Sequence, residues 1–100
     1  MSENLQRNKD FVKLLITTTQ TQVKALLSTV TPAQVQCLVE IAYNLIDTDQ
    51  FQSLHHRQKK LLEYLANLSV NDKRKKPVLI KHRVLLIKVL KNFRDILEAL

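Results

Sequence analysis

Hydrophobic residues recur three or four positions apart along most of the chain, which is typical of amphipathic helices. At the N-terminus this pattern predicts a helix from about Glu3 to Ser28. The stretch Thr17 to Thr21 is rich in threonine, which forms helices poorly, so we expect a kink or a break there. The apolar positions of this helix are Leu5, Val12, Leu15, Ile16, Val23, Leu26 and Leu27.

The clearest helix boundary in the sequence lies at Thr31. A threonine before Pro32, with Gln34 three positions after the threonine, has the spacing of an N-cap, a first-turn proline and a capping box. The second helix should begin here and end near residues 47–50. One face of it carries Val35, Leu38, Val39, Ala42, Leu45 and Ile46.

The second half of the chain predicts two further helices, joined by a basic loop over residues 70–77. The third helix covers residues 54–69 and is expected to be capped by Ser53. Asn71-Asp72 has the composition of a turn, and Pro77 is expected to open a fourth helix that runs to the C-terminus. The apolar stripe of the third helix is Leu54, Leu61, Leu62, Leu65 and Leu68, and that of the fourth is Leu85, Leu86, Val89, Leu90, Phe93, Ile96 and Leu97.

The fold class that follows is all-α, a single domain over residues 1–100 that forms a small bundle of about four helices. The sequence has 100 residues, 45% of them hydrophobic, and no glycine, whereas all-β folds need many turn residues. A shared core is expected around Leu38, Leu45, Leu65, Val89 and Phe93.

Some apolar residues fall outside the expected core stripes. Val84 and Ile87 lie on the less apolar side of the fourth helix, and such a helix is either central in its bundle or covered by a partner. Central burial is the first interpretation and a homo-oligomer the second. Val84, Ile87 and Ile41 are therefore the candidate residues for binding a protein partner.

The positive charge is concentrated in the second half of the chain. Residues 1–50 hold four basic and five acidic residues, whereas residues 51–100 hold twelve basic and four acidic ones. The net charge of +7 favours polyanionic partners, although such charge also serves solubility. The candidate nucleic-acid-binding residues are Arg57, Lys59, Lys60, Lys73, Arg74, Lys75, Lys76, Lys81, Arg83, Lys88 and Lys91.

These residues suit contacts to phosphates better than the reading of bases. Long cationic side chains are sufficient for phosphate contact, whereas base reading needs a row of Asn, Gln or Arg on one exposed helix face. No such row is evident. The five aromatic residues lie mostly at core-type positions, so stacking on single strands is not indicated: Phe11, Tyr43, Phe51, Tyr64 and Phe93.

No motif in the sequence indicates catalysis, a cofactor or a metal. A chain without glycine has no glycine-rich phosphate loop and no nucleophile elbow. His55, His56, His82 and Cys37 lack the spacing of a zinc site, and Cys37 is expected to be a half-buried structural thiol. The expectation is a protein that is not an enzyme.

Two segments, residues 23–46 and 56–93, carry a resemblance to a known family. The most specific parts are T-P-A-Q-V at residues 31–35 and E-I-A-Y-N-L at residues 40–45. They resemble small basic helical proteins encoded by DNA viruses and mobile elements of the Maverick/Polinton and adintovirus type. The resemblance implies a viral or element-encoded origin, a virion-core or genome-associated role, and no catalysis.

The N-terminus is polar and no apolar run approaches the ~20 residues of a membrane span, so neither a secretory signal nor a transmembrane segment is expected. The expected location is inside the cell, in the nucleus or within a virion. The first functional hypothesis is sequence-nonspecific nucleic-acid binding without catalysis. The alternative is a helical protein-interaction module that associates with itself or with another protein.

Overall fold

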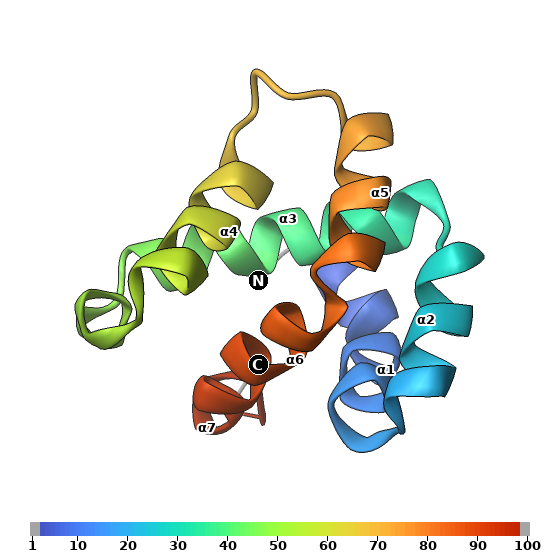
Figure 1. Cartoon of the computed structure of the whole chain (residues 1–100), viewed down its shortest axis with the longest axis horizontal. Coiled ribbons are helices and arrows are strands. Elements are labelled where there is room, and N and C mark those ends of the chain that lie inside the picture. Colours follow the sequence, from blue (N-terminus) through green and yellow to red (C-terminus); the bar gives the residue numbers. More distant parts are fainter. Residues whose placement is uncertain (1–2, 99–100) are drawn as a thin grey trace.

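Every regular element of residues 3–98, the part of the chain that the structure describes, is helical. The structure is a computed structural model (Figure 1). It has seven α-helices and one short 3-10 helix over these residues, so the all-α prediction is confirmed and the expected number of about four helices is wrong. The elements are α1 (Glu3–Thr17), α2 (Gln20–Ser28), α3 (Pro32–Ile46), η1 (Asp49–Ser53), α4 (His56–Ala66), α5 (Asp72–Lys81), α6 (Arg83–Asn92) and α7 (Arg94–Glu98).

The first predicted helix is broken where its threonines lie. Helix α1 ends at Thr17, and Thr19 becomes the N-cap of α2, its hydroxyl oxygen accepting a hydrogen bond from the backbone N–H of Gln22 at 3.3 Å. The break lets α1 pack mainly against α3 and α2 mainly against α5, while both contact α6.

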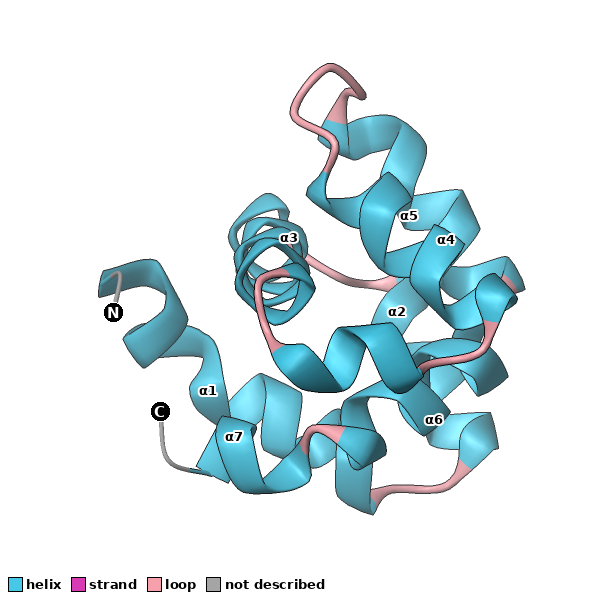
Figure 2. Ribbon diagram, turned by 90° about the vertical axis from the view of Figure 1, so that its left-hand side faces the viewer, coloured by secondary structure: helices cyan, strands magenta, loops and turns pink. Residues whose placement is uncertain are grey.

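Helix α3 is the central element. The predicted capping box is present: the N–H of Gln34 donates to Oγ1 of Thr31 at 3.1 Å, and the N–H of Thr31 donates to Oε1 of Gln34 at 3.0 Å. Figure 2 shows α3 nearly end-on, with α1 on one side and α4 and α5 on the other. Seven of its residues are buried as a result: Val35, Cys37, Leu38, Val39, Ile41, Ala42 and Leu45.

The third predicted helix is shorter than expected at both ends. Ser53 belongs to η1, and the N-cap of α4 is His55, whose N–H donates to Oε1 of Gln58 at 3.2 Å. Helix α4 ends at Ala66, so Leu68 falls outside it and is 76% exposed. The place of Leu68 in the predicted stripe was therefore wrong.

The expected basic loop is a helix. Asn71 is the N-cap of α5, its side-chain oxygen accepting from the N–H of Lys73 at 2.9 Å, so Asp72 opens a helix and not a turn. Pro77 lies inside α5, although a proline removes one backbone hydrogen bond there. Lys75 and Leu79 of this helix are buried, and α5 packs on α2 and α3. This burial accompanies the loss of the backbone hydrogen bond.

The C-terminal part bends twice. The breaks lie at His82 and Phe93, whose φ angles are −106° and −105°. A straight helix from Pro77 to Glu98 would be about 33 Å long. The longest dimension of the molecule is 32 Å, so the bends keep the apolar positions of α6 and α7 against the other helices.

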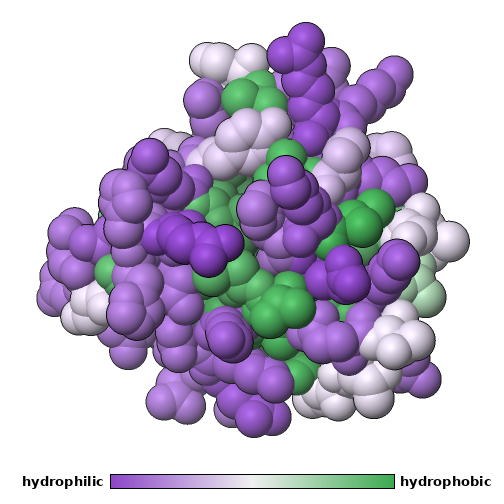
Figure 3. Space-filling view, in the orientation of Figure 1, coloured by the Kyte–Doolittle hydropathy of each residue, from purple (hydrophilic) through white to green (hydrophobic). Residues whose placement is uncertain are grey.

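The predicted core is confirmed at its five central positions. Leu38, Leu45, Leu65, Val89 and Phe93 are each at most 2% exposed and belong to one hydrophobic cluster. In the orientation of Figure 1, hydrophobic surface appears as green patches near the centre, among purple hydrophilic side chains (Figure 3). Hydrophilic groups therefore interrupt the apolar surface on this face.

No single helix in residues 3–98 has both the length and the apolar composition that a bilayer span requires. Helices α2 and α3 reach those criteria only as a pair, and the chain bends by 117° between them.

Candidate nucleic-acid interface and other surfaces

The most uniform basic surface lies on helix α5. Lys73, Arg74 and Lys81 are exposed, and they fall within an arc of about 100° around the helix axis together with exposed Pro77. No carboxylate lies within this arc, because the acidic residue of α5, Asp72, is half-buried on the opposite side. The outward face of α5 can therefore approach a polyanion without a repelling charge of its own.

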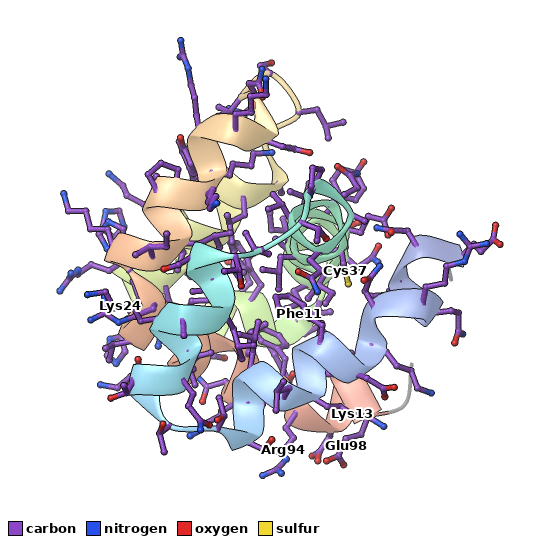
Figure 4. The ribbon with its side chains drawn as sticks, turned by 90° about the vertical axis from the view of Figure 1, so that its right-hand side faces the viewer. Phe11, Lys13, Lys24, Cys37, Arg94 and Glu98 are labelled. Atoms are coloured by element: carbon purple, nitrogen blue, oxygen red, sulfur yellow. The ribbon has the colours of Figure 1, made fainter. Side chains whose placement is uncertain are left out.

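Figure 4 shows the side of the molecule that carries this face. Several side chains tipped with nitrogen project beyond the ribbon of α5, and Lys24 of α2 lies on the same side of the view. Helices α2 and α5 are in contact, and Lys24 is exposed. Lys24 is thus a cation close to the α5 face that sequence reasoning missed, because it stands alone in a segment of low charge.

Lys75 is not available to a phosphate. Its side chain points into the molecule, has 0% exposure and places Nζ 3.4 Å from Oδ1 of Asp72. Lys76 is half-buried on the flank of α5. Residues 73–76 therefore do not form one exposed basic group, because a helix turns successive side chains by about 100° and directs one of the four inward.

The side chain of Arg83 is hydrogen-bonded to a backbone carbonyl oxygen of α5. Its Nη1 donates to the carbonyl oxygen of Ile80 at 2.9 Å, and its Nε is buried without a hydrogen-bond partner. The guanidinium thus satisfies a carbonyl at the C-terminal end of α5. This role stabilises the bend at His82 and leaves Arg83 less free to bind a phosphate.

The basic residues of α4 form a separate group. Arg57 and Lys60 are exposed, but Glu63 lies on the same outward side of the helix as Lys60. The half-buried Lys59 has its Nζ 5.8 Å from the centre of the Phe51 ring, close enough for a cation–π contact. Helices α4 and α5 lie on opposite sides of the view in Figure 1, so the structure does not bring these two basic groups together.

Helix α6 exposes Lys88 and Lys91 beside Val84, which is 50% exposed. Ile87 is 3% exposed because it lies one turn from Leu90 on the buried side of the helix. Ile41 is 2% exposed, since α1 packs on the side of α3 that carries it. Of the three candidate partner-binding residues, Val84 alone is accessible, and the assignment of Ile41 and Ile87 is corrected.

A further apolar surface lies where sequence reasoning did not place one. Tyr43 and Leu68 are 56% and 76% exposed and line one groove with Val39 and with the polar residues Gln36, Glu40 and Asn44. Tyr43 had been assigned to a core-type position. A signal for its exposure was present in the sequence, because Glu40 and Asp47 flank it at helical spacing on the same side of α3.

Cys37 is fully buried, not half-buried as expected. Burial raises the pKa of its thiol to about 11, and the nearby charge of Glu40 raises it further. At neutral pH the group is a thiol and not a thiolate, so it is a poor nucleophile. In the described part of the chain, no three His, Cys, Asp or Glu side chains are grouped so that they could hold a metal ion.

The chain matches no family model, no curated protein and no solved structure. The resemblance to proteins of Maverick/Polinton and adintovirus type therefore stays a prediction. Its most specific part, T-P-A-Q-V, is also the capping box and first turn of α3.

Proposed function

We propose that the chain binds nucleic acid through the phosphate backbone, without sequence readout and without catalysis. The observation that carries this proposal is the outward face of α5, where Lys73, Arg74 and Lys81 share one exposed arc without a carboxylate. Side chains of this kind contact phosphates, and phosphate contacts supply most of nonspecific affinity.

The phosphates would lie along the side of α5 and not at its N-terminus. The N-terminal end of a helix favours anions, but here Asn71 occupies the N-cap and Asp72 adds a negative charge. The outward residues Lys73, Arg74, Pro77 and Lys81 include no Asn or Gln, and the single Arg74 is not the row of base-reading side chains that sequence readout needs. Binding should therefore be nearly independent of sequence.

A helix-turn-helix mode is a weaker explanation. Helices α2 and α3 are bent by 117° across a short turn, which lies within the range of that motif. The second helix of the motif must enter the major groove. Helix α3 is packed on several sides, and phosphates would be repelled by Glu40 on its outward side and by Asp47 at its C-cap.

A virion-core or genome-associated setting would be consistent with this binding, and it rests on the family resemblance alone. A second proposal is protein–protein interaction, favoured by the groove that Tyr43 and Leu68 line. The two proposals use different faces and can be tested separately.

The test compares two lysine pairs of equal charge. Lys73→Gln with Lys81→Gln removes two cations from α5, and Lys9→Gln with Lys13→Gln removes two exposed cations from α1. Fluorescence anisotropy would measure affinity for two unrelated DNA duplexes between about 50 and 200 mM salt. The parent should lose affinity steeply with salt, and the α5 pair should lower the log–log slope by about two units, equally for both duplexes.

The α1 pair is the control and should leave the slope close to that of the parent. Equal slopes for the two variants would contradict binding through α5. Affinity of the parent that does not depend on salt would contradict phosphate binding altogether.

A further inference from the structure

The groove beside Tyr43 is an open and partly apolar surface of the molecule. It has a volume of about 450 Å³ and lies between the outward side of α3, the N-terminal part of α1 and Leu68 in the α4–α5 connection. Tyr43 and Leu68 are the two most exposed of the large apolar residues described. An aromatic ring that is left half in water costs free energy, which a partner can recover by covering it.

The surroundings of this groove are acidic, although the chain as a whole is basic. Glu40 and Asp47 flank Tyr43 along α3, and Glu63 of α4 lines an adjoining hollow that Tyr43 also lines. Among the described residues, no lysine or arginine lines either hollow. The complementary surface is therefore a basic one with an apolar centre.

The chain carries such a surface on the outward side of its own α5. Lys73, Pro77 and Lys81 follow one another at four-residue spacing on the exposed arc, so two cations flank an exposed proline. Along the helix axis the two lysines are about 12 Å apart. Glu40 and Asp47 are about 10.5 Å apart along α3, with Tyr43 between them.

We propose that this groove is a docking site for helix α5 of a second copy of the chain. Pro77 packs on Tyr43 and Leu68, and Lys73 and Lys81 reach the carboxylates of Glu40 in the groove and of Asp47 and Glu63 in the adjoining hollow. The two surfaces are different patches of one molecule, so the contact is head-to-tail and leaves a free groove and a free α5 at the ends of any assembly that does not close into a ring. Such a contact propagates, and it yields assemblies whose size grows with protein concentration.

This inference deepens the second proposed function, protein–protein interaction, and does not require the first. The α5 face that is proposed to bind phosphates is also the one that would enter the groove. A phosphate backbone and a second copy therefore compete for the same three cations, Lys73, Arg74 and Lys81. Duplex DNA should shorten the assemblies if both proposals hold.

The test measures the mass of the protein in solution by sedimentation velocity at low salt, up to about 1 mM, the range of weak complexes. The parent should exceed the monomer mass of 11.6 kDa by an amount that grows with concentration. A groove variant, Asp47→Lys with Glu63→Lys, should stay monomeric. An α5 variant, Lys73→Glu with Lys81→Glu, should also stay monomeric, because like charges then face each other.

A mixture of the two variants is the decisive part of the experiment. The groove variant keeps a basic α5 and the α5 variant keeps an acidic groove, so the two together should associate although each alone does not. Asp47 and Glu63 are exposed, and half-buried Glu40 is left unchanged so that the fold is preserved. Thermal melting of each variant should confirm that both are folded.

The apolar centre is tested by Tyr43→Ser, with Leu14→Ser on α1 as the matched control, since Leu14 is 47% exposed and lies outside the groove. Association should be lost with the first change and kept with the second. A parent that remains at 11.6 kDa at every concentration overturns the proposal, as does a mixture that stays monomeric. Either result leaves the DNA-binding test untouched, because the groove variant retains every cation of α5.

Discussion

The Nζ atom of Lys75 lies 3.4 Å from Oδ1 of Asp72, one turn earlier on α5, and the lysine is 0% exposed. This Nζ has no hydrogen-bond partner that meets the geometric requirements of a good bond. The Asp72 side chain is 39% exposed, so water screens it while the lysine charge is fully enclosed. Lys75 is therefore a buried lysine whose ion-pair partner is a partly exposed carboxylate of the same helix.

Removing that carboxylate should destabilise the protein more than removing the lysine. Asp72→Ala leaves the buried ammonium without its counter-charge and should cost about 1–3 kcal/mol. Lys75→Met keeps the apolar stem and removes the charge, so it should be neutral or stabilising. Urea unfolding of both variants measures the free energies of unfolding.

The double variant serves as the control for other roles of Asp72. An acidic residue in the first turn of a helix contributes about 0.3–1 kcal/mol through the helix dipole. In the Lys75→Met background, Asp72→Ala should cost only this smaller amount. Equal costs in both backgrounds would show that the two side chains do not interact.

The contribution of the α3 N-cap to the stability of the protein should be measurable as well. Thr31→Ala removes the oxygen that accepts the N–H of Gln34 and should cost about 0.5–2 kcal/mol. Thr21→Ala on the exposed side of α2 is the matched control, and it should be neutral or slightly stabilising because alanine favours helix. Similar losses in both variants, measured by thermal melting, would contradict a specific capping role.

Leu65 and Leu68 test the corrected end of α4. Leu65 is 1% exposed and Leu68 is 76% exposed, although both belonged to the stripe predicted for the third helix. Leu65→Ala should cost about 2–5 kcal/mol, as large-to-small changes in a core do, whereas Leu68→Ala should change stability by less than about 0.5 kcal/mol. A large loss from Leu68→Ala in denaturant unfolding would show that the helix continues through this residue.

Local sequence signals were sufficient to predict a helix boundary where they all indicated the same position. At Thr31 the N-cap, the proline and the glutamine all indicated one boundary, and the break among the threonines of residues 17–21 followed from low helix propensity. At α5, Asn71-Asp72 was interpreted as a turn and Pro77 as the helix start, although asparagine is favoured at N-caps as well as in turns. The structure begins the helix with Asn71 as its N-cap, and this start lets Leu79 and the stem of Lys75 pack against α2 and α3.

The surface was harder to predict than the core, because exposure depends on which helices pack together. The pattern of α3 does not reveal that α1 covers Ile41, although Glu40 and Asp47 marked the side of Tyr43 as polar. The basic residues of the second half were visible as a group, yet only the helical form of α5 separates outward Lys73 and Lys81 from inward Lys75. The sequence showed how many basic residues this segment carries, but it did not show which of their side chains point outward.

The pH dependence of stability should report on Cys37. Burial raises the pKa of the folded thiol from 9.0 to about 11, so the folded state keeps its proton where the unfolded state loses it. The unfolded state then binds fewer protons, and stability falls as pH rises from about 9 to about 11. Below pH 9 both states are protonated and this contribution is fully present. A shift of about two pKa units corresponds to about 2–3 kcal/mol.

The informative quantity is the difference in stability between the parent and Cys37→Ala, because contributions common to both proteins cancel in it. Alanine cannot ionise, and therefore the advantage of the parent over the variant should shrink by about 2–3 kcal/mol between pH 9 and pH 11. Urea unfolding at closely spaced pH values would measure both curves. Parallel curves for the two proteins would mean that Cys37 ionises as readily in the folded state as in the unfolded one, which its complete burial among the residues of α3 and the core cluster argues against.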